Sequence, residues 1–302
     1  MENYQVSNAK DKRNKAGIIM ALLSLYVVWG STYLAIRIAL AGFPPFLMAG
    51  LRYIIAGSGL YLFLRMRGAP FPGKKEWAGA GVVGGLLLLG GNGGVAVAEQ
   101  WVASGIAALV IATTPLWTVL FAGIWKRWPT RAEWAGIILG LAGVVILNKG
   151  GELKAHPAGA VALLLAAMFW ALGSAWSRHL LLPQGMMASA AEMIAGGIVL
   201  LLSGLLTGER IETLPDLRAV GALGYLIVFG SLVGFSSYVY LLGKVRPALA
   251  TSYAYVNPII AVGLGVVLAG EHITGTEIIA VPVILSGVVL VILGNKKKRG
   301  LQ

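Results

Sequence analysis

The chain contains 302 residues, of which 58% are apolar before its 42 glycines are counted, and only 12% are charged. Soluble domains carry about 25% charged residues, and a soluble chain of this length has too little interior to hide so much apolar surface. Composition therefore excludes an ordinary soluble enzyme and favours a protein whose outer face contacts lipid. The formal net charge of +12 does not indicate a nucleic-acid partner, because Lys and Arg lie in short clusters between long apolar runs. The absence of Cys excludes disulfides, thiolate metal sites and a cysteine nucleophile.

Ten apolar stretches are each long enough to cross the hydrocarbon core of a bilayer. Their predicted bounds are residues 17–38, 45–64, 77–97, 104–125, 132–148, 158–179, 186–207, 218–241, 248–269 and 276–294. The first stretch follows a basic segment, as the core of a signal peptide would. Its apolar run is longer than such a core and is followed by Trp29, Tyr33 and Arg37, so we expect a retained helix.

The distribution of Lys and Arg predicts the orientation of the chain. With the N-terminus inside, 18 of the 24 basic residues fall in inner segments and 4 in outer segments, while Arg37 and Arg52 lie within spans. We therefore predict a multi-pass protein of the bacterial inner membrane with both termini in the cytoplasm. Its cytoplasmic tails are expected to comprise residues 1–16 and 295–302.

The two halves of the chain repeat one another. Trp29 and Arg37 recur as Trp170 and Arg178, and the two pairs share one offset along the chain. Later matches keep a similar offset, namely Thr114-Pro115 with Asn257-Pro258, and Gly143-Val144-Val145 with Gly287-Val288-Val289. Each repeat, residues 17–148 and residues 158–294, holds five spans, so the second must be inverted in the membrane. The predicted fold is an all-α integral membrane protein of ten transmembrane helices, arranged as two inverted five-helix repeats around a central cavity.

Residues 17–294 resemble the EamA-type, ten-helix members of the drug/metabolite transporter superfamily. The resemblance rests on the run from Trp29-Gly30-Ser31 to Arg37, on Pro44 to Ala56-Gly57, on Ser104-Gly105-Ile106-Ala107-Ala108 leading to Pro115, and on Glu271 with Thr274. It implies a basket in which spans 1–4 and 6–9 surround a cavity, with spans 5 and 10 at the periphery. Family substrates include amino acids, amines, drugs, nucleotide sugars and lipid-linked sugars.

Prolines fall near the middle of the fourth and ninth spans. Each removes a backbone N–H and frees carbonyl groups of the preceding turn, which need a protein partner or a wet cavity. A kink healed by a neighbouring side chain is the alternative to a cavity wall. The residues predicted to line the cavity here are Thr113, Thr114, Pro115, Asn257 and Pro258.

Aromatic and small polar side chains add further candidates for the cavity wall. Trp29 and Trp170 lie past the midpoints of their spans, where they could stack on a flat or cationic substrate or simply pack between helices. Asn92 lies in a glycine-rich run that suits either tight helix packing or a moving, substrate-facing surface. The remaining candidates are Ser31, Trp117, Ser236, Tyr240 and Tyr253.

Four charged residues are candidates for coupling or gating. Arg37, Arg52 and Glu99 lie toward the outer side, where an ion-pair network is one interpretation and snorkelling of Arg37 is another. Glu192 lies about seven residues inside the seventh span. It could be a proton site, a cation site or a partner of Arg178, and a facilitator without ion coupling is equally open.

The sequence predicts transport rather than catalysis. The three His residues lie far apart near span ends, and no phosphate loop or nucleophile elbow is present, so we expect no enzyme, cofactor, metal or ATP-driven step. The favoured hypothesis is alternating-access export of amino acids or related amphipathic compounds. The alternatives are a multidrug or amine exporter that uses Glu192 or Glu99, and a flippase of a lipid-linked intermediate. Expected partners are a small-molecule substrate, the bilayer and, if transport is coupled, a proton; the expected assembly is a monomer or weak homodimer.

Overall fold

The computed structural model describes residues 15–297 except 126–127, 150–155, 246–249 and 251–252. The described part of the chain is all-helical and makes ten helical passes. Seven of these passes are long and apolar enough to cross a membrane, namely Lys15–Ala39, Pro45–Met66, Lys74–Ala98, Ser104–Phe121, Pro157–Trp176, Met186–Leu206 and Leu217–Lys244. The other three are α8 (Arg131–Asn148), α15 (Tyr253–Ala269) and α16 (Gly275–Lys297).

The helix bounds follow from residues that begin helices well. The second pass, α3 (Pro45–Met66), starts with proline, whose missing N–H costs nothing in a first turn. At the start of α8, the Thr130 Oγ accepts from the Glu133 N–H at 3.3 Å and the Glu133 carboxylate accepts from the Thr130 N–H at 2.6 Å. The repeat-related start of α16 pairs Thr274 with Glu277 at 2.9 Å.

Three passes change to a π-helix near their middle. The first pass contains η1 (Leu25–Trp29) before α2 (Gly30–Ala39). The third contains η2 (Gly85–Gly93) between α4 (Lys74–Gly84) and α5 (Gly94–Ala98), and the eighth contains η4 (Leu226–Phe235) between α12 (Leu217–Tyr225) and α13 (Ser236–Lys244). The starts of η2 and η4 are separated by the same offset as Trp29 and Trp170, so these π-helices occupy equivalent places in the two repeats. Such segments are frequent at functional sites because they disturb the regular ladder of backbone hydrogen bonds.

The fourth pass is broken close to its proline, where a kink is the alternative to a cavity wall. It consists of α6 (Ser104–Ile111), α7 (Thr114–Phe121) and the short 3₁₀ turn η3 (Ala122–Trp125). The break at residues 112–113 lies directly before Pro115. The ninth pass keeps Pro258 inside a continuous α15.

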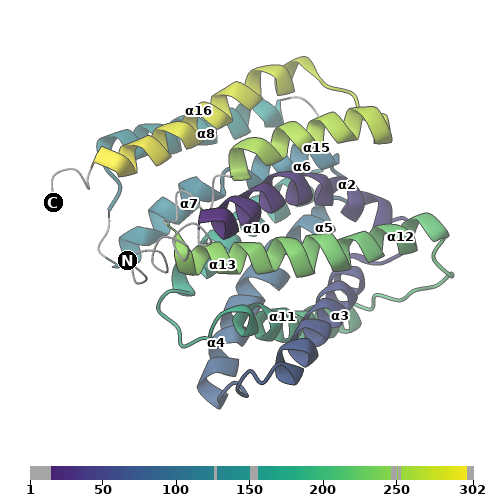
Figure 1. Ribbon diagram of the computed structural model, residues 1–302. Coiled ribbons are helices and arrows are strands. Elements are labelled where there is room, and N and C mark those ends of the chain that lie inside the picture. Colours follow the sequence, from purple (N-terminus) through teal and green to yellow (C-terminus); the bar gives the residue numbers. More distant parts are fainter. Residues whose placement is uncertain (1–14, 126–127, 150–155, 246–249, 251–252, 298–302) are drawn as a thin grey trace.

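Equivalent passes of the two repeats pack against each other. The pair α8 and α16 lies along one edge of the molecule (Figure 1). A side chain at Gly287 would come within 2.5 Å of the Gly140 nitrogen, so this pair approaches to backbone contact. In the same way, a side chain at Gly57 of α3 would meet the backbone of Ile194 in α11 (Met186–Leu206). The fifth and tenth passes are therefore peripheral, as the family resemblance implies.

The first pass begins and α16 ends at the same end of the bundle (Figure 1). An even number of passes requires this arrangement. The helices extend slightly beyond the predicted spans: the first begins at Lys15 and the last ends at Lys297, so the predicted tails contribute residues to both helices. The rest of those tails, and most of residues 248–252 of the predicted ninth span, lie outside the described residues.

Candidate functional site

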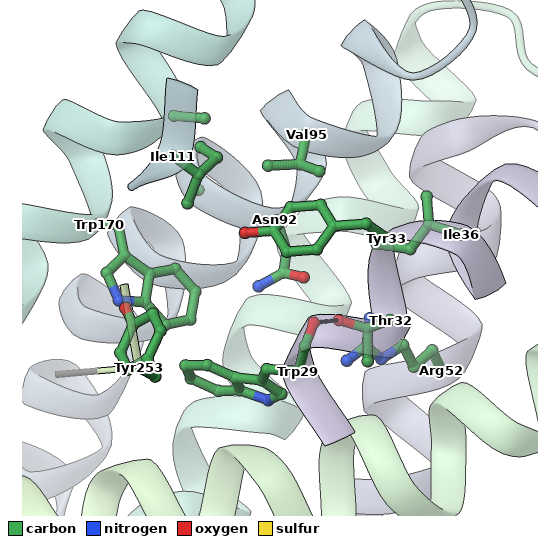
Figure 2. Close-up of a pocket in the computed structure, with 12 residues that line it drawn as sticks. Trp29, Thr32, Tyr33, Ile36, Arg52, Asn92, Val95, Ile111, Trp170 and Tyr253 are labelled. Carbon is green, nitrogen blue, oxygen red and sulfur yellow. Dashed lines mark hydrogen bonds between the residues drawn. The ribbon is translucent and has the colours of Figure 1, made fainter. Parts of the chain in front are cut away.

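A narrow cavity lies at the centre of the bundle and receives side chains from both repeats (Figure 2). The cavity is small, with a volume of about 50 Å³, and it is partly open to solvent. The first repeat supplies η1, α2, α3, η2, α5 and α6, and the second supplies α10 (Pro157–Trp176) and α15. The lining residues are Trp29, Thr32, Tyr33, Ile36, Arg52, Gly91, Asn92, Val95, Ile111, Ala166, Trp170 and Tyr253.

One side of the cavity is a cluster of four aromatic rings. The Trp29 ring centroid lies 5.4 Å from that of Trp170, 5.2 Å from that of Tyr238 and 5.0 Å from that of Tyr253. Trp29 meets Trp170 and Tyr253 edge to face, the geometry that ring quadrupoles favour. Tyr238 anchors the cluster because its hydroxyl is 2.7 Å from the Ser174 Oγ. Trp29 and Trp170, which the repeat relates, thus meet across the molecular centre.

The indole of Trp29 is held by the π-helix η4. Its Nε1 donates to the Gly230 carbonyl at 3.2 Å. A Cβ at Gly234 would clash with the same indole, so glycine is required for the ring to lie against η4. The π-helix therefore supplies both an acceptor and a surface without side chains for this ring.

The other side of the cavity is polar. Arg52, Thr32 and Asn92 point toward the cavity from α3, α2 and η2 (Figure 2). Thr32 donates its Oγ1 hydrogen to the Trp29 carbonyl at 2.7 Å, and the Arg52 Nε donates to the Ser231 Oγ at 2.7 Å. Arg52 is only 3% exposed, and among the described residues no Asp or Glu lines the cavity.

The proline-associated candidates lie next to the cavity rather than in its lining. Thr113 and Thr114 donate to the Val110 and Ile111 carbonyls, each at 2.6 Å. The carbonyl at the broken turn is thus satisfied by a local hydroxyl, while the Ile111 side chain lines the cavity. The Trp117 Nε1 donates to the Thr113 Oγ1 at 3.3 Å. Pro115 and Pro258 are both buried.

Asn257 contacts carbonyl groups of the first π-helix and of its own helix. With its amide nitrogen turned toward them, it donates to the carbonyls of Tyr26 at 3.1 Å, Leu25 at 3.2 Å and Tyr253 at 3.2 Å. Because Asn257 is 3% exposed, these bonds replace water. The residue joins α15 of the second repeat to η1 of the first.

The remaining candidates are distributed around the cavity. Ser31 donates to the Val28 carbonyl and lies 2.6 Å from the Tyr225 hydroxyl. The Ser236 Oγ is buried with no hydrogen-bond partner among the described residues, and Tyr240 packs near the start of the first pass at Gly17. Glu192 is 1% exposed in α11, outside the cavity lining.

Carboxylates join the two repeats at one end of the bundle, which we name the Glu271 end. Glu271 follows α15 and caps the start of α6, accepting from the Ser104 N–H at 3.0 Å, the Ser104 hydroxyl at 2.9 Å and the Gly105 N–H at 3.3 Å. Its carboxylate also lies 3.7 Å from the Arg37 Nε. Glu209 acts similarly at the start of α3, accepting from the N–H groups of residues 46 and 47.

Of the three charged residues expected toward the outer side, Arg37 and Glu99 do not bond to each other. The ion pair of Arg37 is with Glu271, and its Nη1 donates to the Val102 carbonyl at 3.0 Å. Glu99 is buried directly after α5, and neither carboxylate oxygen has a hydrogen-bond partner among the described residues. Arg52 is separated from this group because it faces the cavity. Spacing along the chain could not reveal Glu271 as the partner, since it belongs to the other repeat.

The opposite end of the bundle, which we name the Arg178 end, carries the repeat-related contact. The Arg178 Nη2 donates to the carbonyls of Leu242 at 3.1 Å and Val245 at 3.4 Å. The bond from Arg37 to Val102 and the bond from Arg178 to Val245 join nearly equivalent positions of the two repeats. Each end therefore has a guanidinium that ties the end of one pass to the segment after the pass two further along in the same repeat.

The sequence analysis missed seven lining residues: Thr32, Tyr33, Ile36, Gly91, Val95, Ile111 and Ala166. One usable signal exists for the first three, because Trp29, Thr32, Tyr33 and Ile36 follow the i, i+3, i+4, i+7 spacing of a single helix face. Ala166 lies one helical turn before Trp170 and can be placed by the same rule. Gly91 and Val95 flank Asn92 but give no separate signal, since similar residues fill the spans.

Comparisons with known proteins agree with this architecture. A family model described as "EamA-like transporter family" matches residues 15–149 and again residues 157–293. The chain is 48% identical over 276 residues to "Uncharacterized inner membrane transporter YedA" of Escherichia coli strain K12, covering 91% of this chain and 90% of that protein. It is 24% identical over 302 residues to "Probable amino-acid metabolite efflux pump" of Salmonella typhimurium strain LT2, covering 93% and 96%. A solved structure described as "Crystal structure of protein" has the same fold, with a TM-score of 0.67 at 22% identity, covering 92% of this chain and 98% of that one.

Proposed function

Because the chain belongs to the EamA-like transporter family, we propose that it exports amino acids or related amphipathic metabolites by alternating access. The observation that carries this proposal is the central cavity, whose wall combines residues of both repeats. A site between two inverted halves is the arrangement from which a carrier can open to either side by exchanging the roles of the halves. The relative named as an amino-acid metabolite efflux pump supports the substrate class and the direction.

The contacts at the two ends supply candidate gates. The Lys and Arg distribution favours cytoplasmic termini, which places the Glu271 end toward the periplasm and the Arg178 end toward the cytoplasm. Opening outward then requires release of Glu271 from the start of α6, because this contact ties the second repeat to the first. The cavity is narrow, so admitting a metabolite also requires its walls to separate.

Glu192 is the candidate for proton coupling. It is buried in α11, and its Oε2 has no hydrogen-bond partner among the described residues. Ionisable residues buried within membrane-spanning helices mark proton and ion pathways in carriers, and movement of the surrounding helices would change the access of Glu192 to water. An amine exporter would need Glu99 or Glu192 in the cavity wall, and neither lines the cavity described here, so we do not favour that alternative.

Transport assays in proteoliposomes test the proposal. Counterflow and efflux are measured for a panel of metabolites, each with and without a pH gradient. We expect efflux of at least one amphipathic amino acid above that of empty liposomes. A Trp29→Ala variant should lose it, while Leu62→Ala, at a position 60% exposed on α3, should retain it. Wild-type vesicles that match empty liposomes across the panel would refute the function. Glu192→Gln should abolish any stimulation by the pH gradient, and a full response in that variant would exclude Glu192 from coupling.

A further inference from the structure

The cavity contains one buried positive charge without a protein counter-ion among the described residues. Arg52 is 3% exposed, and its guanidinium projects from α3 toward the cavity (Figure 2). Within the same part of the chain, Ser231 supplies its single hydrogen-bond acceptor, at 2.7 Å from Nε, and no carboxylate lies within ion-pair distance. A guanidinium carries five N–H donors and remains protonated in proteins. Four donors of this group therefore have no acceptor from the described protein.

The packing around Arg52 holds the group in place. Its Cζ lies 4.7 Å from the centroid of the Tyr53 ring. A Cβ at Gly230 would come within 2.7 Å of its Nη2, so the absence of a side chain there gives the guanidinium its place against η4. The plane of the guanidinium is thus fixed by Tyr53 of α3 and by Ser231 and Gly230 of η4. The free edge of the guanidinium borders the cavity.

A buried, unpaired charge is costly, and a planar guanidinium is geometrically matched to a carboxylate through two parallel hydrogen bonds. The side chains around the rest of the cavity match the apolar or aromatic body of such a molecule in chemistry, once the walls separate to admit it. Trp170 and Tyr253 form the wall across the cavity from Arg52, and Asn92 lies between the two sides (Figure 2). A cation without a carboxylate would be repelled by Arg52 and would find no carboxylate counter-ion, because no Asp or Glu lines the described cavity; the aromatic rings alone would attract it.

We propose that Arg52 binds the carboxylate of the transported molecule and that the substrate class is an organic carboxylate with an apolar or aromatic body. The site then requires the carboxylate of an amino acid, and it tolerates the amine near Asn92 and Thr32 without requiring it. This inference rests on the proposed function to the extent that the cavity is the transport site. It predicts selectivity by charge, which the family resemblance does not provide.

Two sets of matched ligands test the inference by equilibrium binding to the full-length protein in lipid nanodiscs, measured by titration calorimetry. The aromatic set is phenylalanine, 3-phenylpropanoate, which lacks the amine, and 2-phenylethylamine, which lacks the carboxylate. The aliphatic set is leucine, 4-methylpentanoate and 3-methylbutylamine. In at least one set we expect the two carboxylates to bind and the amine to bind about ten- to hundred-fold more weakly, as loss of a hydrogen bond to a charged group predicts. An amine that binds as tightly as its parent, or absence of binding by all six compounds, would overturn the inference.

Variants of Arg52 provide the second arm. Arg52→Gln should weaken binding of the carboxylates by about ten- to hundred-fold and leave the amine unchanged or tighter. Arg52→Lys keeps the charge but not the planar fork, so a smaller loss is expected, and this variant decides the matter if the glutamine variant does not fold. Arg218→Gln, at an exposed position on α12, controls for the loss of one positive charge. Unweakened carboxylate binding by a folded Arg52 variant would contradict the assignment.

Binding and transport are measured separately, so the two proposals fail differently. Carboxylate binding that depends on Arg52, without efflux from proteoliposomes, supports the site and contradicts the exporter function. Efflux of amines with no dependence on Arg52 contradicts this inference and leaves the transporter function standing.

Discussion

Replacing Glu271 by Gln should weaken the closure of the Glu271 end. The carboxylate accepts three hydrogen bonds from Ser104 and Gly105, and these bonds join the second repeat to the first. Gln keeps one acceptor oxygen but loses the negative charge that favours a position at a helix N-terminus. The ion pair with Arg37 adds little, because the two atoms are 3.7 Å apart and the Arg37 side chain is 40% exposed.

The size of the effect follows from these contacts. Hydrogen bonds to charged groups contribute about 1.5–3 kcal/mol, and an N-terminal cap contributes about 0.5–2 kcal/mol. Since Gln retains part of the network, we expect a loss of about 1–2 kcal/mol from the closed state, which shifts the closed-to-open ratio by a factor of about 5–30. Glu271→Ala removes every side-chain acceptor and should have an effect at least as large.

Labelling of a single introduced cysteine measures this shift. The chain contains no Cys, so Ile36→Cys, at a position lining the cavity on α2, would be the one thiol. We expect Glu271→Gln to increase the rate at which a membrane-impermeant maleimide added from the periplasmic side labels this thiol. Glu277→Gln is the matched control, because Glu277 lies in the same region but bonds to Thr274 at the start of its own helix. An unchanged labelling rate in folded Glu271→Gln protein, or an equal increase in the control, would refute the role of Glu271.

Three further predictions concern packing, polar satisfaction and pH. Gly287→Ala places a Cβ against the backbone of α8 and should destabilise the protein by about 1–3 kcal/mol in thermal unfolding, whereas Gly263→Ala, with open space at its Cβ, should not. Asn257→Ala removes a buried side-chain donor to carbonyls of η1 and should lower the free energy of unfolding by about 1–3 kcal/mol, and an unchanged transition would contradict the assigned amide orientation. Burial raises the pKa of Glu99, which follows the last residue of α5, well above its ordinary value; Arg37 opposes this rise and Glu271 adds to it. The Glu99 carboxyl therefore holds a proton in the closed state and releases it in a hydrated open state. Rising pH should then favour opening and increase the labelling rate in the cysteine assay. Glu99→Gln should remove this dependence of the labelling rate on pH.

The passes and their pairing could be predicted from the sequence because the bilayer imposes a length on every apolar helix. The positions of the spans and the place of the break near Pro115 follow from hydropathy and proline chemistry, whereas the sequence indicates only that Trp29 and Trp170 are related by the repeat and not that their rings meet. The family resemblance supplied the peripheral position of α8 and α16. Each of these features is determined by the local sequence of one helix or by the internal repeat, and both can be read from the sequence.

The rotation of each helix about its axis could not be predicted. In a soluble helix, polar residues mark the outer face, but here lipid-facing and cavity-facing positions are both apolar. Leu62 faces outward at 60% exposed, while Leu60 on the same helix is buried at 8%, and their residue type does not distinguish them. The sequence therefore located Arg52 in a span but could not direct it to the cavity. The sequence also could not indicate the π-helices, because the equivalent segments share no common composition. The segment η2 is glycine-rich, whereas η4 contains only two glycines.

Under the proposed alternating access, the repeat also predicts that Glu271 matters more than Arg37 for the balance between the two open states. The bonds from Arg37 to Val102 and from Arg178 to Val245 are related by the repeat, so they contribute to both ends alike and cannot by themselves favour one. Glu271 breaks this equivalence, because the residue that matches it in the first repeat is Arg127, which has the opposite charge. An acidic side chain stabilises a helix N-terminus and a basic one does not. An inverted repeat of nearly equal halves can thus acquire a preferred resting state through one pair of equivalent positions.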